Sequence, residues 1–264
     1  MMQIGAEIGP VLDGDQLRVM TAALSEESTR REHVVVYLSG AHAYGFPSPD
    51  SDLDLKAVHV ENTAALVGMT APQPTFDRAE VIDGVEIDYT SNELAHALGG
   101  VLAGNGNFIE RFLGRMVVVA SPLLAELVPI VTRSLSRRVH RHYRGFAESQ
   151  LRFLEKEPSV KKLLYVLRTT LTGIHLLETG ALEADLTRIA GHYGVGDASS
   201  LVERKRAGER TRIEPALLEE WRPRVHALLA RLDAARDASV LPPEPTNGDE
   251  VTAALLAIRR ARFD

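Results

Sequence analysis

The stretch of sequence that decides the fold is Val34–Val60, VVVYLSGAHAYGFPSPDSDLDLKAVHV. Its first five residues, Val34–Leu38, are apolar and mostly β-branched. A run of that length and composition predicts a buried strand rather than a helix. The strand ends at Ser39-Gly40, and a second turn, rich in proline and serine, covers residues 46–51. The chain then becomes extended again, so a glycine turn connects two expected strands.

Two aspartates in the second extended segment face the same way. Asp52 and Asp54 alternate there with Leu53 and Leu55, and residues i and i+2 of a strand point to one side of it. The leucines therefore point into the core, and the two carboxylates repel each other on the opposite side. A divalent cation, Mg²⁺ or Mn²⁺, removes that repulsion, and such ions are commonly held by carboxylates and substrate phosphates. The pattern favours a metal and phosphate site, although spacing alone also allows an edge strand with an acidic outer face. His59 lies on the opposite side of this strand and is expected to be structural.

The same stretch resembles a known active-site signature. Residues 40–45, GAHAYG, followed by residues 51–54, SDLD, are similar to the pattern of the polymerase-β nucleotidyltransferase superfamily. The closer resemblance is to its RNA-repair-associated branch, which reads G-S-R-A-Y-G and then S-D-x-D. This resemblance implies an α/β (α+β) nucleotidyltransferase domain with a small mixed sheet, a nucleoside triphosphate such as ATP as substrate, and Mg²⁺ or Mn²⁺.

The resemblance also assigns roles to individual residues. The implied metal ligands are Asp52 and Asp54, and the implied nucleotide-contacting residues are Gly40, Ala41, Tyr44 and Ser51. Ala41 stands where the family has serine, and His42 stands where it has arginine. Ala41 has no hydroxyl to offer to a phosphate, so only its backbone N–H remains for that contact.

Composition limits the possible classes of protein. The chain has 264 residues, of which 45% are hydrophobic and 25% charged, as in ordinary globular proteins. Its formal charge is −6, so a nucleic-acid surface must be local. There is no cysteine, which excludes disulfides, zinc–thiolate sites and a cysteine nucleophile. Without an apolar run long enough to cross a membrane or a signal-peptide pattern, we expect a cytoplasmic protein with no membrane partner.

A third carboxylate is expected from a neighbouring strand. Residues 61–80 read as a loop that could cover the site, and Asp83-Gly84 is a hairpin turn signal. The next run, residues 85–89, is a strand in which two acidic residues share one face. Asp88 is the preferred third metal ligand and proton acceptor, and it matches the third aspartate of the resembling family. Glu86 is its rival, and an exposed acidic strand face is the alternative to both.

Strand signals disappear in the second half of the chain. We therefore expect a nucleotidyltransferase domain at residues 1–120 and an α-helical domain at residues 121–264, whose closing helix buries Leu255, Leu256 and Ile258. A cluster of basic side chains with interleaved aromatic rings lies at 137–144. It could bind the backbone of a nucleic acid such as RNA or tRNA, or a triphosphate, or it could be the solvated face of a helix.

A second basic pair lies on the helix predicted over residues 159–180. Lys161 and Arg168 are seven residues apart and so share a helix face, which suits the phosphates of a nucleoside triphosphate. The resembling family has a K-x-x-x-H-x-x-R arrangement here, with Tyr165 in place of its histidine. A solvated basic face is the alternative.

These features predict a cleft between the two domains that holds Mg²⁺ and a nucleoside triphosphate. Asp52, Asp54 and Asp88 would form the site, an acceptor hydroxyl would attack the α-phosphate, and pyrophosphate would leave. Three acceptors or roles stay open: an RNA or tRNA end in RNA repair, a small molecule or protein (including a toxin-type activity), and non-catalytic nucleotide binding.

Overall fold

The computed structural model of the protein describes residues 5, 7–206, 208 and 212–263. The chain forms two compact units. The first contains the described residues up to Gly40, then Asp52–Ser134, and the described residues from Pro245 onward. The second contains Ala41–Ser51 and the described residues between Leu135 and Glu244. This division differs from a single boundary near residue 120, because the loop of residues 41–51 belongs to the second unit and the last helix belongs to the first.

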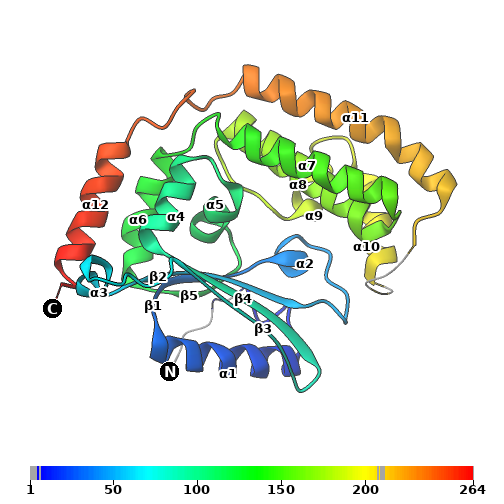
Figure 1. Cartoon of the computed structure of the whole chain (residues 1–264). Helices are drawn as coiled ribbons and strands as arrows, with labels where there is room; N and C mark the ends of the chain where they lie inside the picture. Colours follow the sequence, from blue (N-terminus) through cyan, green and yellow to red (C-terminus); the bar gives the residue numbers. More distant parts are fainter. Residues whose placement is uncertain (1–4, 6, 207, 209–211, 264) are drawn as a thin grey trace. The chain divides into compact units, whose positions relative to one another are not determined.

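A five-stranded mixed sheet forms the centre of the first unit (Figure 1). Its strands are β1 (Glu32–Leu38), β2 (Leu53–Val60), β3 (Thr75–Ile82), β4 (Val85–Glu93) and β5 (Val117–Ala120). They lie in the order β3-β4-β2-β1-β5, in which β2 and β4 are parallel and the other neighbours are antiparallel. The predicted α/β fold with a small mixed sheet and a helical C-terminal region is confirmed.

Helices cover both faces of this sheet. The helices of the first unit are α1 (Gly14–Arg30), α3 (Thr63–Val67), α4 (Leu94–Leu102), α5 (Gly106–Leu113), α6 (Pro122–Arg133) and α12 (Gly248–Arg260). Figure 1 shows α1 along one face of the sheet and α4, α5 and α6 on the other. β1 is buried from His33 to Leu38. A strand covered on both faces has no solvent side, which is why its sequence is continuously apolar from Val34 to Leu38.

The β3–β4 hairpin confirms one expectation from the sequence and contradicts another. Asp83 and Gly84 have φ values of 50° and 83°, as a two-residue type I′ turn requires, so the predicted turn is confirmed. Residues 75–80, however, are strand rather than loop, because β3 pairs with β4 from Thr75 to Ile82. The strand was hard to recognise because β3 is an edge strand with no fully buried position.

The second unit is helical. It contains α7 (Val139–Lys156), α8 (Val160–Thr179), α9 (Leu186–Ile189), a 3₁₀ helix (Gly196–Ala198), α10 (Ser199–Arg206) and α11 (Pro215–Asp237). The central helix, α8, packs against α7 and α11. Ser159 caps α8 by accepting a hydrogen bond from the Lys162 backbone N–H, and Gly180 ends it with φ 73°. The helix predicted over residues 159–180 is therefore confirmed.

The closing helix α12 docks within the first unit. Its Arg259 backbone oxygen accepts a hydrogen bond from Thr63 Oγ1 at 2.8 Å, and the Arg259 guanidinium pairs with Glu93. Ile258 is buried as expected, but Leu256 is 47% exposed, so the expected burial of Leu256 is wrong. Polar contacts at its C-terminal end, together with burial of a few apolar residues, hold this helix. In the described part of the chain, no helix combines the length and the hydrophobicity needed to cross a membrane.

Candidate active site

Strand pairing places two of the predicted carboxylates side by side. Asp54 of β2 is the register partner of Asp88 of β4 in the parallel pair. Since side chains alternate along a strand, both carboxylates lie on one face of the sheet, and their neighbours Leu55 and Tyr89 are buried on the other. Glu86 shares the parity of Asp88 but precedes the first β2–β4 pair, which begins at Ile87. The structure therefore pairs Asp88, rather than Glu86, with Asp54.

Lys56 joins these two carboxylates, a feature that the sequence reasoning missed. Its Nζ lies 2.9 Å from Asp88 Oδ2 and 3.8 Å from Asp54 Oδ1. The lysine side chain is 21% exposed, against 29% for Asp54 and 51% for Asp88. The ammonium group compensates part of the repulsion between two like charges on adjacent strands. Its position two residues after Asp54, on the same face of β2, was the signal in the sequence.

Asp52 is not drawn into this cluster. It lies one residue before β2 begins and is exposed. Within the described ranges, no group of three or more histidine, aspartate or glutamate side chains is close enough together to hold a metal ion. The predicted convergence of three aspartates is therefore seen only for Asp54 and Asp88, and the role of Asp52 as a ligand stays a prediction.

The glycine turn lies directly against Asp54. Gly40 has φ 65°, and a Cβ atom placed on it would lie 2.0 Å from Asp54 Oδ2. The Ser39 backbone N–H donates a hydrogen bond to the Asp54 backbone oxygen at 2.7 Å. Only glycine accommodates both the backbone conformation and the adjacent carboxylate. Two carboxylates on one face, with backbone packed closely against one of them, are hard oxygen donors of the kind that suit Mg²⁺ or Mn²⁺. The donor set of Asp54 and Asp88 therefore fits a divalent cation.

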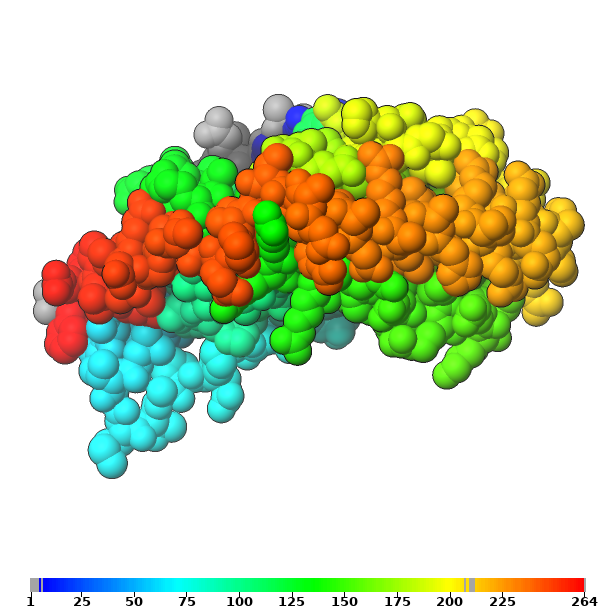
Figure 2. Space-filling model, turned by 90° about the horizontal axis from the view of Figure 1, so that it is seen from above, coloured from blue at the N-terminus to red at the C-terminus, as the bar shows by residue number. Residues whose placement is uncertain are grey.

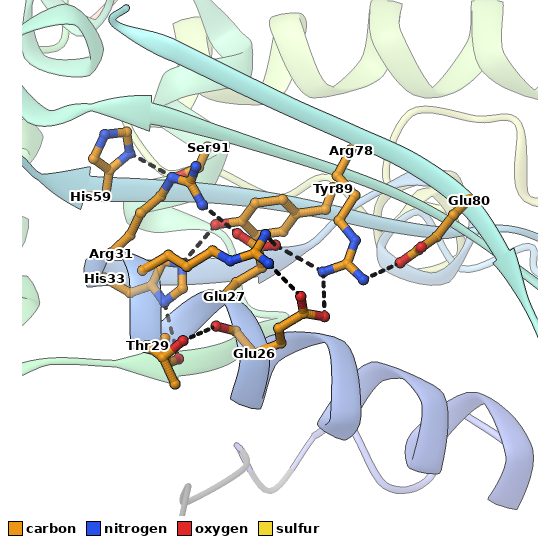
Figure 3. A network of polar contacts seen from close by, with 12 residues as sticks. Glu26, Glu27, Thr29, Arg31, His33, His59, Arg78, Glu80, Tyr89 and Ser91 are labelled. Atoms are coloured by element: carbon orange, nitrogen blue, oxygen red, sulfur yellow. Dashed lines mark hydrogen bonds and ion pairs between the residues drawn. The ribbon is translucent and has the colours of Figure 1, made fainter. Parts of the chain in front are cut away.

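A buried network on the opposite face of the sheet holds β4 in place (Figure 3). His33 Nε2 is 2.7 Å from the Tyr89 hydroxyl, and His59 Nδ1 is 2.7 Å from Ser91 Oγ. Burial, followed by the nearby His59, lowers the pKa of His33 to about 4. Burial also lowers the pKa of His59 and raises that of Tyr89 to about 12. His59 is buried on the face opposite Asp54 and Asp88 and contacts Ser91, so the expectation that it is structural is confirmed.

Charged residues complete this network beneath the sheet. The Glu27 carboxylate of α1 is only 1% exposed, and it pairs with Arg31 and, at 2.8 Å, with Arg78 of β3. The guanidinium of Arg31 also stacks 3.6 Å from the centroid of the Phe76 ring. A carboxylate buried this deeply needs paired cations. Because Tyr89 and Ser91 alternate with Asp88 and Thr90, anchoring one side of β4 also fixes the side on which Asp88 projects.

The loop of residues 41–51 lies in the helical unit and closes on itself. Ala41 and Tyr44 are 6% and 5% exposed. Ser51 Oγ accepts a hydrogen bond from the Ser48 backbone N–H at 3.0 Å and lies 3.1 Å from Ser48 Oγ. Ser48 in turn accepts a hydrogen bond of 2.6 Å from Lys205 Nζ, and Lys205 is completely buried. Lys205 lies in a run of three basic residues, 204–206, which gives no sign in the sequence of which one turns inward.

The predicted basic pair of α8 meets this loop within the same unit. The Arg168 guanidinium carbon lies 3.5 Å from the centroid of the Tyr44 ring, and Arg168 is 5% exposed. Tyr165 packs edge-on against Tyr44 and Phe46, with centroids 5.8 Å and 5.5 Å apart. Lys161 Nζ lies 6.0 Å from the Tyr165 ring. Aromatic contacts thus link three of the predicted nucleotide-contacting residues, Tyr44, Lys161 and Arg168.

Most of the basic cluster at 137–144 is compensated within its own unit. Arg137 donates hydrogen bonds to the backbone oxygens of Leu241 and Ser239. Other side chains of the cluster form ion pairs: Arg138 with Glu244, His140 with Asp233, and Arg144 with Asp233 and Glu148. These contacts reduce the charge that the cluster as a whole can offer to RNA.

Comparison with known proteins gives the family. The chain is 30% identical over 158 residues to an uncharacterized protein of Methanocaldococcus jannaschii, an alignment that covers 58% of this chain and 64% of that protein. A crystal structure of a nucleotidyltransferase-like protein from Exiguobacterium sibiricum is 12% identical with a TM-score of 0.33, covering 94% of this chain and 80% of the other. Residues 18–256 match the model of the RNA repair pathway DNA polymerase beta family, and the chain belongs to that family.

Proposed function

We propose that the protein is a Mg²⁺- or Mn²⁺-dependent nucleotidyltransferase that transfers a nucleoside monophosphate from a nucleoside triphosphate to a hydroxyl acceptor. The observation that carries this proposal is the register pair of Asp54 and Asp88, packed against the glycine turn at Gly40. Membership of a polymerase-β-type family supports the reaction class. Carboxylates on adjacent strands are what a metal-assisted phosphoryl transfer requires.

Each side chain of the site has a distinct task in this proposal. Asp54 and Asp88 hold the metal ion, and Asp52 is the proposed further ligand. When bound, the ion neutralises charge on the phosphates and favours loss of the acceptor proton. Asp88, the more exposed of the paired carboxylates, accepts the proton of the attacking hydroxyl. Lys56 keeps the two carboxylates at a fixed separation through its contacts with both.

The triphosphate is assigned to the signature loop and to α8. Backbone N–H groups at Gly40 and Ala41 and the side chains of Tyr44, Ser51, Lys161 and Arg168 are the proposed contacts. Arg168 supports this role because stacking on Tyr44 fixes the direction of its guanidinium. A positioned cation of this kind stabilises charge that develops on phosphate oxygens during transfer.

An RNA end is the acceptor that we propose first, on the strength of the family to which the chain belongs. A small molecule or a protein is the second candidate. The internal ion pairs of the 137–144 cluster favour a small-molecule or protein acceptor, because they compensate most of the positive charge with which this cluster could bind RNA.

The experiment is transfer of label from α-labelled nucleoside triphosphates, with Mg²⁺ or Mn²⁺, to RNA ends, small hydroxyl compounds and the protein itself. Asp54→Asn and Asp88→Asn should each reduce labelling at least 100-fold. Glu86→Gln is the matched control, because Glu86 lies on the same strand and face but outside the β2–β4 pairing, and it should label like the unmodified protein. Equal labelling by all three variants would refute the proposal.

A further inference from the structure

One side of α7 carries cations and aromatic rings and lies away from the fully buried side of the helix. At 3.6 residues per turn, successive side chains are about 100° apart around the axis. The residues that fall within one sector of roughly 140° are Arg141, His142, Gly145, Phe146, Ser149, Arg152, Phe153 and Lys156. We call this set the α7 stripe. Its three basic side chains lie along one edge of the sector, and its three rings lie along the other.

The α7 stripe is open to solvent. Arg141, Arg152 and Lys156 are exposed, and Phe146 and Phe153 are 38% and 51% exposed. The core contacts of the helix are made by a different side, formed by Val139, Tyr143, Ala147 and Leu154. Figure 2 shows the green surface of α7 uncovered along one side of α11. Two large exposed phenylalanines on one helix are thus not explained by folding, and exposed apolar groups that gather in this way mark interaction sites.

The cations of the α7 stripe are not neutralised by direct ion pairs within the described residues. In the part of the chain that the structure describes, no ion pair involves Arg141, Arg152 or Lys156. The acidic residues of α7 border the cation edge of the stripe, and each is paired with a different arginine: Glu148 with Arg144 at 2.6 Å, and Glu155 with Arg222 at 3.8 Å. The three cations of the stripe are therefore available to an anionic ligand although the whole chain carries a formal charge of −6.

The rings of the α7 stripe lie in a row along the helix, and two of them are stacked. His142 and Phe146, one turn apart, are stacked with an interplanar angle of 17° and centroids 5.8 Å apart. Phe153 lies two turns further along the same edge, about 10 Å from Phe146 along the axis. Aromatic faces in line with a row of cations are the arrangement by which proteins hold single-stranded nucleic acid, with bases on the rings and phosphates on the cations.

We propose that the α7 stripe binds a single-stranded polynucleotide. From Arg141 to Lys156 the helix rises about 22 Å, enough for a short strand. A duplex fits less well, because its base faces are stacked inside and cannot reach Phe146 or Phe153. An anionic membrane also fits less well, because two phenylalanines give little apolar area to insert and the protein as a whole is acidic. The inference rests on the proposed function only for the use of the strand as acceptor, not for binding.

The test is fluorescence anisotropy with labelled single-stranded RNA and DNA of about 12 nucleotides, a usual site size, without metal or nucleotide. The variant Arg141→Gln/Arg152→Gln/Lys156→Gln should bind at least tenfold more weakly. Phe146→Ala/Phe153→Ala should also lose at least tenfold, since each base–ring stack contributes about that factor. Three phosphate contacts predict that raising salt from 50 to 200 mM weakens the unmodified protein about 20-fold, and that the triple variant loses most of this dependence.

Matched controls separate the stripe from general charge. Arg18→Gln/Arg30→Gln/Arg133→Gln changes the net charge equally at exposed, ion-paired arginines and should bind normally. Asp54→Asn should also bind normally while failing in nucleotidyl transfer, which keeps the two proposals distinguishable. Circular dichroism checks that the variants fold.

Three outcomes would overturn the inference: no binding of either strand by the unmodified protein, unchanged binding by both stripe variants, or stripe-dependent binding to phosphatidylserine vesicles alone.

Discussion

The close approach of Gly40 to Asp54 makes Gly40→Ala a direct test of the candidate site. A methyl group at this position would lie 2.0 Å from Asp54 Oδ2, 2.9 Å from Cγ and 3.1 Å from Cβ. The carboxylate must therefore turn away. Alanine must also adopt φ 65°, which costs about 1–2 kcal/mol for a residue with a Cβ. At roughly 2–4 °C per kcal/mol, the melting temperature should fall by about 2–8 °C.

The loss of function should exceed the loss of stability. A carboxylate displaced by about 1 Å from its working position can cost a factor of about 100 in rate. We expect Gly40→Ala to remain folded below its melting temperature, to bind Mn²⁺ at least tenfold more weakly in an electron paramagnetic resonance titration, and to label acceptors about 100-fold more slowly. The Mn²⁺ titration does not depend on knowing the acceptor.

Gly84→Ala provides the control. Gly84 also has a positive φ, 83°, but a Cβ there would meet nothing within 4 Å. It should therefore show a similar fall in melting temperature, from the same backbone strain, with Mn²⁺ binding unchanged. If both variants keep Mn²⁺ affinity, or both lose it equally, the argument that Gly40 is required for the position of Asp54 is wrong.

Two further predictions concern charges around the sheet. Lys56→Met removes the ammonium group between Asp54 and Asp88. Without metal, the free energy of unfolding should fall by about 1 kcal/mol and the melting temperature by a few degrees. Mg²⁺ should then stabilise the variant more than the unmodified protein, and equal Mg²⁺ effects in thermal melts would contradict this. The pKa of His33 is about 4 in the folded protein, against 6.5 for an ordinary histidine, so the unfolded chain binds a proton that the folded chain does not. The contribution of neutral His33 to the free energy of unfolding is therefore fully present above pH 6.5, and it falls by about 3 kcal/mol as the pH drops to 4. The lowered pKa of His59 acts in the same direction. Urea unfolding at pH 7.5, 6 and 5 measures this slope, and a slope that stays unchanged in His33→Gln would show that another group causes it.

Several features of the molecule could be predicted because their signals are local. The apolar run Val34–Leu38 forms β1, Asp83-Gly84 forms the hairpin turn, and residues 159–180 form the capped helix α8. In each case the side-chain period or the turn chemistry depends on residues within one or two turns of chain. The side of β2 on which Asp54 projects follows from the same period of two.

For β1, β2, β4 and α8, the sequence alone determined which side chains share a face, because that is set by backbone geometry over a few residues. Tertiary structure decided which of them meet. The pairing of Asp54 with Asp88 rather than Glu86 depends on hydrogen-bond register between strands more than 30 residues apart, and no local pattern encodes such a register. Likewise Asp233, from a distant helix, neutralises part of the 137–144 cluster and leaves Arg141 exposed. Charge at a surface is a sum over neighbours in space, and only the folded chain defines those neighbours.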